Sequence, residues 1–136
     1  MLRAEFTIHG KPFAKQRHRT TKTGHTYTPK GTVSFESVVR EIGAKAFEEP
    51  LKGPVKMCIH ACFQIPKSRM KGKDKLIPGQ YHIQKPDSDN LQKAIGDGLN
   101  RIAFVDDCQV AIAHCRKTWG TEEYTTVAIY ELEDNV

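Results

Sequence analysis

The chain has 136 residues, a formal net charge of +5 and 38% hydrophobic residues. This length suits one domain with its own hydrophobic core. The sequence contains no apolar run of about 18 residues, which excludes a transmembrane helix, and its N-terminus lacks the apolar segment of a signal peptide. We therefore expect a soluble cytoplasmic protein without membrane contact, folded as a single domain over residues 1–136.

In chain order, the first half of the sequence predicts strand, loop, helix and strand. Residues 4–10 alternate apolar and polar side chains, which is typical of a strand. The basic loop that follows contains Gly24, which suits the turn of a short hairpin. A helix is expected from Thr32, a candidate N-cap, to about Phe47, and residues 54–64 predict a strand with one apolar face.

The second half predicts a further basic loop, an amphipathic helix and two strands. The helix carries apolar residues at helical spacing from Leu91 to Ile102. The strands are expected over residues 107–119 and 123–132, with a turn at Gly120 between them. This order favours an α/β (α+β) fold, in which a mixed β-sheet carries two main helices.

Positive charge is confined to two segments, Lys11–Lys30 and Ile65–Lys85. These 41 residues hold 12 of the 21 Lys and Arg residues and one of the 16 acids, whereas the rest of the chain has a net charge of −6. Two basic loops on an acidic body indicate a polyanionic partner, with nucleic acid first, although solvated loops that aid solubility are the alternative. The residues that we expect to bind DNA are Lys11, Lys15, Arg17, Arg19, Lys67, Arg69, Lys71, Lys73 and Lys85.

The four cysteines follow no common zinc-binding spacing, and we interpret them as buried reduced thiols. Two nearby histidines, His60 and His114, keep zinc open as an alternative. The cysteines are Cys58, Cys62, Cys108 and Cys115.

Five aspartates lie within the 23 residues from Lys85 to Asp107, although the chain is basic overall. Asp89, Lys93 and Asp97 are spaced by four on the predicted helix. Each step of four turns about 40° around a helix, so these side chains form one polar row beside the buried stripe. The five aspartates are Asp87, Asp89, Asp97, Asp106 and Asp107.

Ordinary helix chemistry explains only part of this cluster. Asp89 followed by Gln92 matches a capping box, and ion pairs at a spacing of four would occupy Lys93. Neither explains the carboxylates outside the helix, which repel one another unless a cation compensates them. Oxygen ligands without His or Cys favour Mg²⁺ or Mn²⁺, and the spacing does not fit a calcium-binding EF-hand. Metal-bound carboxylates beside basic loops indicate a metal-dependent nuclease or phosphotransferase.

The stretch KPDSDNLQKAIGDGLN…VDDCQV closely resembles the signature of the RusA family of Holliday junction resolvases, small endonucleases of bacteria and their prophages. The family pattern is a basic residue near D-x-D-N-L-x-K, an Asp four residues after that Lys, and D-D-x-Q. The N-terminal GKPFAKQRHR…GHTYTPKGTVSFE is similar to the family's opening. The resemblance covers about residues 4 to 132.

The resemblance implies a Mg²⁺-dependent homodimer, with Mn²⁺ as a substitute, in a bacterial or phage-infected cell. It would cut four-way DNA junctions by paired nicks in recombination and repair. The implied catalytic residues are the metal-binding aspartates Asp87, Asp89 and Asp107, together with an essential lysine, Lys93.

Strand alternation favours Asp107 over Asp106 as a metal ligand, because Asp106 shares the parity of the apolar residues Cys108 and Val110 on the predicted strand. Asp97 and Asp106 are further candidates for a place beside the metal. Two other functions stay open, a related metal nuclease acting on other branched DNA and a non-catalytic nucleic-acid-binding module.

Overall fold

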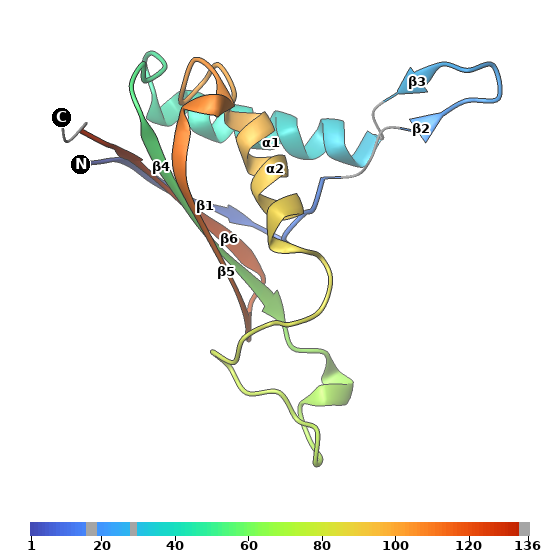
Figure 1. Cartoon of the computed structure of the whole chain (residues 1–136). Helices are drawn as coiled ribbons and strands as arrows, with labels where there is room; N and C mark the ends of the chain where they lie inside the picture. Colours follow the sequence, from blue (N-terminus) through green and yellow to red (C-terminus); the bar gives the residue numbers. More distant parts are fainter. Residues whose placement is uncertain (16–18, 28–29, 134–136) are drawn as a thin grey trace.

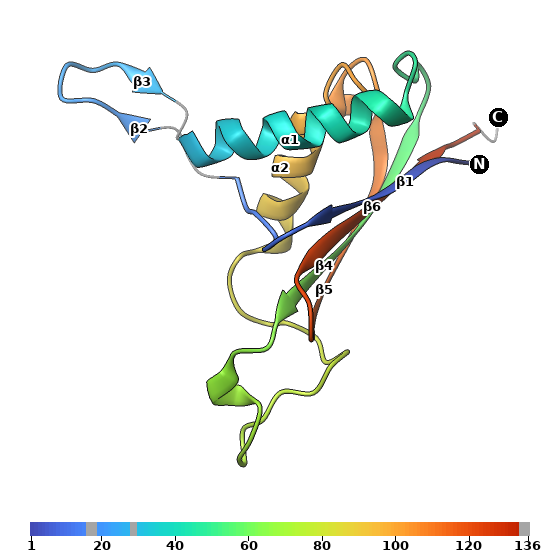
Figure 2. The same ribbon diagram turned by 180° about the vertical axis from the view of Figure 1, so that it is seen from behind.

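The structure, a computed structural model, describes residues 1–15, 19–27 and 30–133. Within them, four strands form a mixed sheet in the order β1-β6-β4-β5, and two helices cover one face of it (Figures 1 and 2). This arrangement confirms the expected α+β fold. The elements are β1 (Leu2–His9), α1 (Lys30–Ala46), β4 (Val55–Gln64), α2 (Ser88–Leu99), β5 (Val110–Gly120) and β6 (Tyr124–Glu131).

The core lies between the sheet and the two helices. The central strand β4 pairs in parallel with β5 and antiparallel with β6, which in turn pairs antiparallel with β1. Alternate residues of β4 from Val55 to Phe63 are buried, as its apolar face predicted. The first half of that face packs in one cluster with Val39 of α1 and with Ile95 and Leu99 of α2.

Glycine lets the two helices approach each other closely. A Cβ atom added to Gly98 of α2 would lie 2.7 Å from the side chain of Val39 in α1, which is too close for any real contact. Similarly, a Cβ atom added to Gly43 of α1 would lie 2.8 Å from the side chain of Leu99 in α2. Gly96 of α2 has no atom within 4 Å of such a position. The packing of α1 on α2 therefore depends on Gly98 and not on Gly96.

Both helices begin earlier than the sequence predicted. Helix α1 begins at Lys30, and Thr32 is fully buried within its first turn rather than standing before it. Helix α2 begins at Ser88, because Asp87, the residue directly before it, still has an extended backbone (φ −71°, ψ 148°). Asp89 therefore lies inside the first turn and is not the N-cap. Within the described ranges, no helix is long and apolar enough to cross a membrane.

Two segments project from this core, with the N-terminal end of α2 between them (Figures 1 and 2). The first belongs to the first basic loop (residues 11–30). It contains a hairpin of β2 (Arg19–Thr20) and β3 (Thr26–Tyr27), which turns at Gly24 with a φ of 88°, as predicted.

The second projection, which we name the lobe (residues 65–85), begins with a 3-10 turn, η1 (Lys67–Arg69). Its returning arm lies along the edge of β5. There the backbones of Gly79 and Gln80 bond to Trp119, and the N–H of His82 donates to the carbonyl of Lys117. The lobe therefore covers the C-terminal end of this strand edge.

Candidate active site

The start of α2 is fixed by a lysine that sequence reasoning missed. Lys117 of β5 donates from its Nζ to the carbonyl oxygens of Gln84 and Pro86, at 2.6 and 2.7 Å. These bonds hold the chain directly before Asp87. The Asp87 side chain is exposed and makes no capping hydrogen bond. Its position is set by the backbone, and its carboxylate oxygens are available to a ligand.

The polar row on α2 does not form the helical ion pairs that its spacing allows. Asp89 and Lys93 are exposed, and neither has an ion-pair partner among the described residues. Asp97 pairs instead with Lys15 of the first basic loop. Neither capping nor local ion pairing therefore accounts for Asp89 and Lys93.

Lys15 joins the first basic loop to both helices. Its ammonium group pairs with Asp97 and lies 3.6 Å from Glu36 of α1, and its backbone N–H donates to the carbonyl of Asn90 at 3.1 Å. The hydrogen bond to Asp97 raises the pKa of Lys15 above its ordinary value. This lysine thus has acidic partners in the free chain, and its contact with DNA stays a prediction.

The second group of aspartates lies on a turn, not on the strand that the sequence predicted. Residues 107–109 form the 3-10 turn η2 (Asp107–Gln109), so that β5 begins only at Val110 and the strand-parity argument fails. Asp106 caps this turn, with its Oδ1 accepting the N–H of Cys108 at 3.1 Å. The prediction was wrong because a capped turn and the beginning of a strand can both start with polar residues, so the sequence alone did not distinguish them.

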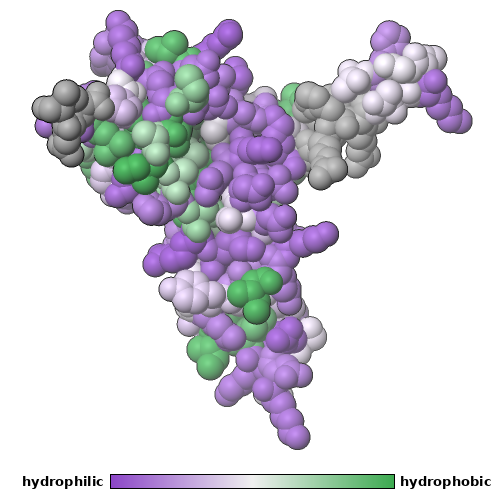
Figure 3. Space-filling view, viewed as in Figure 1, coloured by the Kyte–Doolittle hydropathy of each residue, from purple (hydrophilic) through white to green (hydrophobic). Residues whose placement is uncertain are grey.

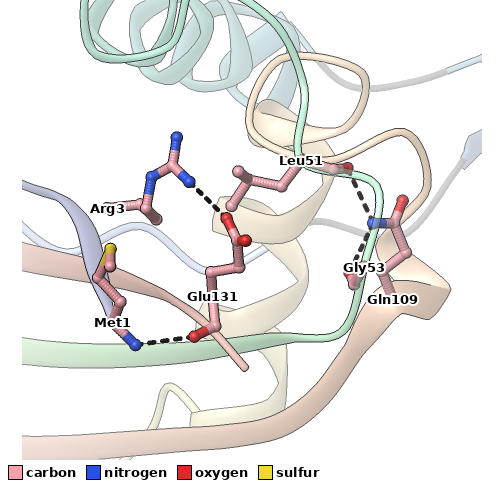
Figure 4. A network of polar contacts seen from close by, with 6 residues as sticks. All are labelled: Met1, Arg3, Leu51, Gly53, Gln109 and Glu131. Atoms are coloured by element: carbon pink, nitrogen blue, oxygen red, sulfur yellow. Dashed lines mark hydrogen bonds and ion pairs between the residues drawn. The ribbon is translucent and has the colours of Figure 1, made fainter. Parts of the chain in front are cut away.

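Gln109, the last residue of the D-D-x-Q motif, anchors this turn to the rest of the fold. Its Nε2 donates to the carbonyl oxygens of Leu51 and Gly53, each at 2.9 Å (Figure 4). Its Oε1 accepts the N–H of Asp106. The N–H of Asp107 donates to the side-chain oxygen of Asn100 at 3.0 Å. The turn is therefore fixed at the C-terminal end of α2, just after the helix.

Three carboxylates share one electrostatic neighbourhood at this end of α2. A hydrogen bond with Asp106 raises the pKa of Asp107 above its ordinary value, and burial and repulsion from Asp106 and Asp97 raise it further. The backbone N–H of Cys108 holds the pKa of Asp106 below its ordinary value. Asp106 thus uses its carboxylate to cap the turn. The Asp107 carboxylate has no such capping role.

The expected metal ligands are divided between the two ends of α2. Asp87 is the N-cap residue and Asp89 lies in the first turn, whereas Asp107 is bonded to Asn100, the C-cap residue. A helix of 12 residues is about 18 Å long. Accordingly, no group of three or more His, Cys, Asp or Glu side chains within the described part of the chain could hold a metal ion. The oxygen donors suit Mg²⁺ in kind, but one chain does not gather them.

The expected DNA-binding residues are distributed over the two projections. Lys11, Lys67 and Lys85 line a common cavity at the base of the lobe. Hydrophilic side chains cover the tip of the lobe (Figure 3). Lys71 and Lys73 of the lobe are exposed.

The structure says less about the remaining residues that were expected to bind DNA. Arg69 donates from its Nε to the carbonyl of Asp74 at 2.8 Å. Arg17 lies outside the described residues, and Arg19 is placed through its backbone in β2. Their contact with DNA stays a prediction.

Sequence reasoning found the motif residues but missed some of their supports. Gln109 carried a signal, because it belongs to D-D-x-Q. Lys117 carried no such signal, since a lysine near the end of a predicted strand is expected to be exposed to solvent. His82 of the lobe is 5% exposed, and nothing in its basic, Gly- and Pro-containing segment predicted burial.

The chain matches a family model described as "Endodeoxyribonuclease RusA" over residues 9–130. It is also similar to "Uncharacterized protein YqaN" of Bacillus subtilis (strain 168). The two are 29% identical over 136 residues, covering 94% of this chain and 96% of that protein. The family match includes both ends of α2, the turn η2 and both projections. The chain therefore belongs to the RusA family of endodeoxyribonucleases, the enzymes that resolve Holliday junctions.

Proposed function

We propose that the protein is a Mg²⁺-dependent endonuclease that resolves four-way DNA junctions by paired nicks in recombination and repair. The main support is the position of exposed, unpartnered carboxylates at the start of α2, between two basic projections (Figure 1). Phosphates attracted to the first basic loop and to the lobe would lie beside these carboxylates. The enzyme would act in the cytoplasm of a bacterial or phage-infected cell.

We assign the metal to Asp87, Asp89 and Asp107, with Mg²⁺ as the ion and Mn²⁺ as a substitute. When bound, the ion stabilises charge on the phosphate and makes a bound water more acidic. Lys93, one turn after Asp89, would neutralise the charge that develops on the scissile phosphate.

Replacement of Lys93 by Ala tests this role. It should lower kcat about a hundredfold and change KM little, because the interaction belongs to the transition state. Steady-state kinetics on a four-way junction would measure both. A raised KM with an unchanged kcat would instead make Lys93 a phosphate anchor.

The division of the aspartates between the two ends of α2 favours a homodimer. Without rearrangement, Asp107 does not reach an ion held by Asp87 and Asp89 of the same chain, because about 18 Å of helix separates them. A second copy can supply the missing ligand. In this arrangement Asp107 of one protomer joins Asp87 and Asp89 of its partner.

The free edge of β5 offers an interface that produces this meeting. The lobe bonds to the edge of β5 that faces away from β4, at Lys117 and Trp119. Within the described residues, nothing pairs with this outer edge from Val110 to Arg116. Residues 111–114 of this stretch are exposed. An unpaired strand edge is a ready template for another strand. Antiparallel pairing of the whole stretch with its own copy sets Val110 opposite Arg116.

The same register sets Lys117 of one protomer opposite Gln109 of its partner. Lys117 holds the segment before Asp87, and Gln109 ends the turn that carries Asp107. Asp87 of one protomer and Asp107 of the other therefore come to the same region, and they do so twice in a two-fold dimer. Two composite sites would match the two strands that must be cut in a junction.

A synthetic four-way junction tests the proposed activity. With Mg²⁺ we expect two symmetric nicks, and we expect none with EDTA or on a linear duplex of the same sequence. Equal cutting of flaps and three-way junctions would support the nuclease for other branched DNA. Tight binding without cleavage in Mg²⁺ or Mn²⁺ would support the non-catalytic binding module.

A further inference from the structure

A cavity of about 480 Å³ lies at the base of the lobe. Its volume is within the range of roughly 300–1,000 Å³ that is typical of ligand pockets. Lys85 and Pro86 line it, and they directly precede Asp87. The cavity is thus next to the proposed metal site along the chain, yet none of the residues assigned to catalysis lines it.

One wall of the cavity is aromatic. His82 stacks on Phe63 with ring centroids 3.9 Å apart and an interplanar angle of 21°, and its ring lies 4.4 Å from that of Trp119. All three side chains are less than one tenth exposed. Aromatic rings are the usual partners of nucleobases, since every base has a π-face, and the parts of these rings that remain exposed line the cavity.

This wall is held in place by the backbone. The N–H of Trp119 donates to the carbonyl of Gln80 at 2.8 Å, and the N–H of His82 donates to the carbonyl of Lys117 at 3.0 Å. Phe63 is fixed in β4 opposite Trp119 in the parallel ladder. A ligand that stacks here therefore meets a surface that is already ordered, which lowers the entropic cost of binding.

His82, which lines the cavity, also has an unsatisfied polar atom. Its Nδ1 is buried and has no hydrogen-bond partner among the described residues. Buried polar atoms are rarely left unpaired, because they lose their hydrogen bonds to water. Burial and the nearby Lys117 lower the pKa of His82, so that the neutral ring, with one donor and one acceptor nitrogen, is favoured.

Three lysines from different segments complete the lining. Lys11 comes from the first basic loop, and Lys67 and Lys85 come from the two arms of the lobe. Among the described residues of the lining, Glu123 is the one acid, so these residues give the cavity a net positive charge. Ammonium groups bind phosphate as mobile point charges, which suits the phosphates on either side of a nucleotide.

We propose that this cavity binds one nucleotide of the strand being cut, with its base unstacked from the duplex and placed against Trp119 and His82. The lysines contact the flanking phosphates, and a polar group of the base or sugar satisfies His82. This inference rests on the proposed junction cleavage and adds to it a determinant of substrate choice.

Such a cavity would distinguish branched from linear DNA. Removal of a base from its stack costs a few kcal/mol in an intact duplex and least where pairing is already disturbed. Nucleotides at a branch point are disturbed in this way. The cavity would therefore admit a base from a junction more readily than one from a duplex, and it would do so next to the carboxylates that carry the metal.

The fluorescence of Trp119 gives a direct test, because it is the chain's single tryptophan. Titration with a four-way junction in EDTA, where cleavage is absent, should quench this emission saturably. A linear duplex of the same sequence and free deoxynucleoside monophosphates should quench it at least about fivefold less at equal concentration, since stacking on an ordered aromatic surface needs an unstacked, positioned base. Equal quenching by the duplex would overturn the proposal.

A junction that lacks one base provides the decisive arm. Once the cut is mapped, an abasic nucleotide beside it should abolish most of the quenching and slow cleavage at least about fivefold. Fluorescence anisotropy of labelled DNA should show that both junctions still bind. If the two junctions quench and react alike, the cavity does not hold a base.

Two variants connect this effect to the cavity. His82→Phe keeps an aromatic ring but removes Nδ1, and Lys67→Gln removes one charge from the lining. Each should reduce the ratio of cleavage rates between the normal and the abasic junction, whereas Lys45→Gln, on the exposed last turn of α1, should leave that ratio unchanged. An unchanged ratio in Lys67→Gln, whose surface position does not threaten folding, would contradict the proposal even if His82→Phe failed to fold.

The two proposals fail separately. Normal junction cleavage with no change in Trp119 emission would remove the cavity from the mechanism and leave the nuclease intact. Absence of junction binding by anisotropy would instead remove the proposed function.

Discussion

The two ends of α2 present their carboxylates differently. At the N-terminal end, Asp87 and Asp89 are exposed and have no partner within the described residues. At the C-terminal end, Asp97 is paired with a lysine and Asp106 caps its own turn, so that Asp107 is the carboxylate that remains for a ligand. One end thus offers two exposed carboxylates at the start of a helix, and the other offers one carboxylate on a tightly bonded turn.

This difference suggests that each chain carries two incomplete half-sites. In the proposed site, the N-terminal end would supply the two exposed carboxylates of Asp87 and Asp89. The turn would supply one more, Asp107, whose position is fixed by Gln109 and Asn100. Among the described residues, neither end gathers enough carboxylates to hold an ion alone. In the proposed dimer the two kinds of end complete each other.

Removal of a single carboxylate from either end of α2 should have the largest effect on junction cleavage. We expect Asp87→Asn, Asp89→Asn and Asp107→Asn each to slow junction cleavage about a thousandfold, because a metal contributes several kcal/mol to the transition state. Binding of the junction should persist, as anisotropy would show. Asp106→Asn should have a much smaller effect, and an equal loss would place Asp106 in the metal site.

The next largest effect should come from a charge at the proposed dimer interface. Ala113 faces its own copy at the centre of the paired β5 edges, so that Ala113→Glu brings two like charges together. We expect a folded monomer by sedimentation, with cleavage reduced about a hundredfold at low protein concentration. Thr7→Glu, an exposed change on β1 at the other edge of the sheet, is the matched control. A dimer that survives Ala113→Glu would exclude this edge.

Loss of the lysine under the N-terminal end should have a moderate effect. Lys117→Met removes both hydrogen bonds to the segment before Asp87, and a supporting residue of this kind typically changes metal affinity by roughly tenfold or more. We expect a raised Mg²⁺ concentration for half-maximal cleavage and a partial recovery in Lys117→Arg. If the Mg²⁺ dependence were unchanged, Lys117 would serve stability alone.

The smallest effect on the cleavage rate should come from changes in the packing of α2 on α1. Gly98→Ala places a methyl group against Val39 and should destabilise the fold by about 1–3 kcal/mol. Gly96→Ala has open space and should stabilise it by up to about 1 kcal/mol, because alanine favours helix. Chemical denaturation would compare the two, and equal values would refute the close approach at Gly98.

The sequence predicted most of the fold because its signals were local. Alternation in residues 54–64 and helical spacing from Leu91 to Leu99 matched the buried faces of β4 and α2. The ends of elements were less predictable. Asp89 had the pattern of an N-cap, but the backbone at Asp87 started the helix earlier.

The candidate site was predicted by motif and not by distance. The short spacing between Asp89 and Asp107 suggested one cluster, yet the helix between them separates the two aspartates. Likewise, Lys15 was expected to bind DNA, but its pairing with Asp97 joins positions 82 residues apart. Such contacts depend on how elements pack, and no local pattern encodes them.

The most direct test of the composite site mixes two inactive variants. Asp89→Asn chains and Asp107→Asn chains should each be inactive alone. In a mixed dimer whose sites are shared, one site carries both substitutions and the other carries neither, so that singly nicked junctions should appear on mixing in Mg²⁺. Wild-type chains diluted into an excess of Asp89→Asn chains should give the same singly nicked product. If the two variants stay inactive after exchange of subunits is shown to be complete, each site belongs to one chain and the composite site is wrong.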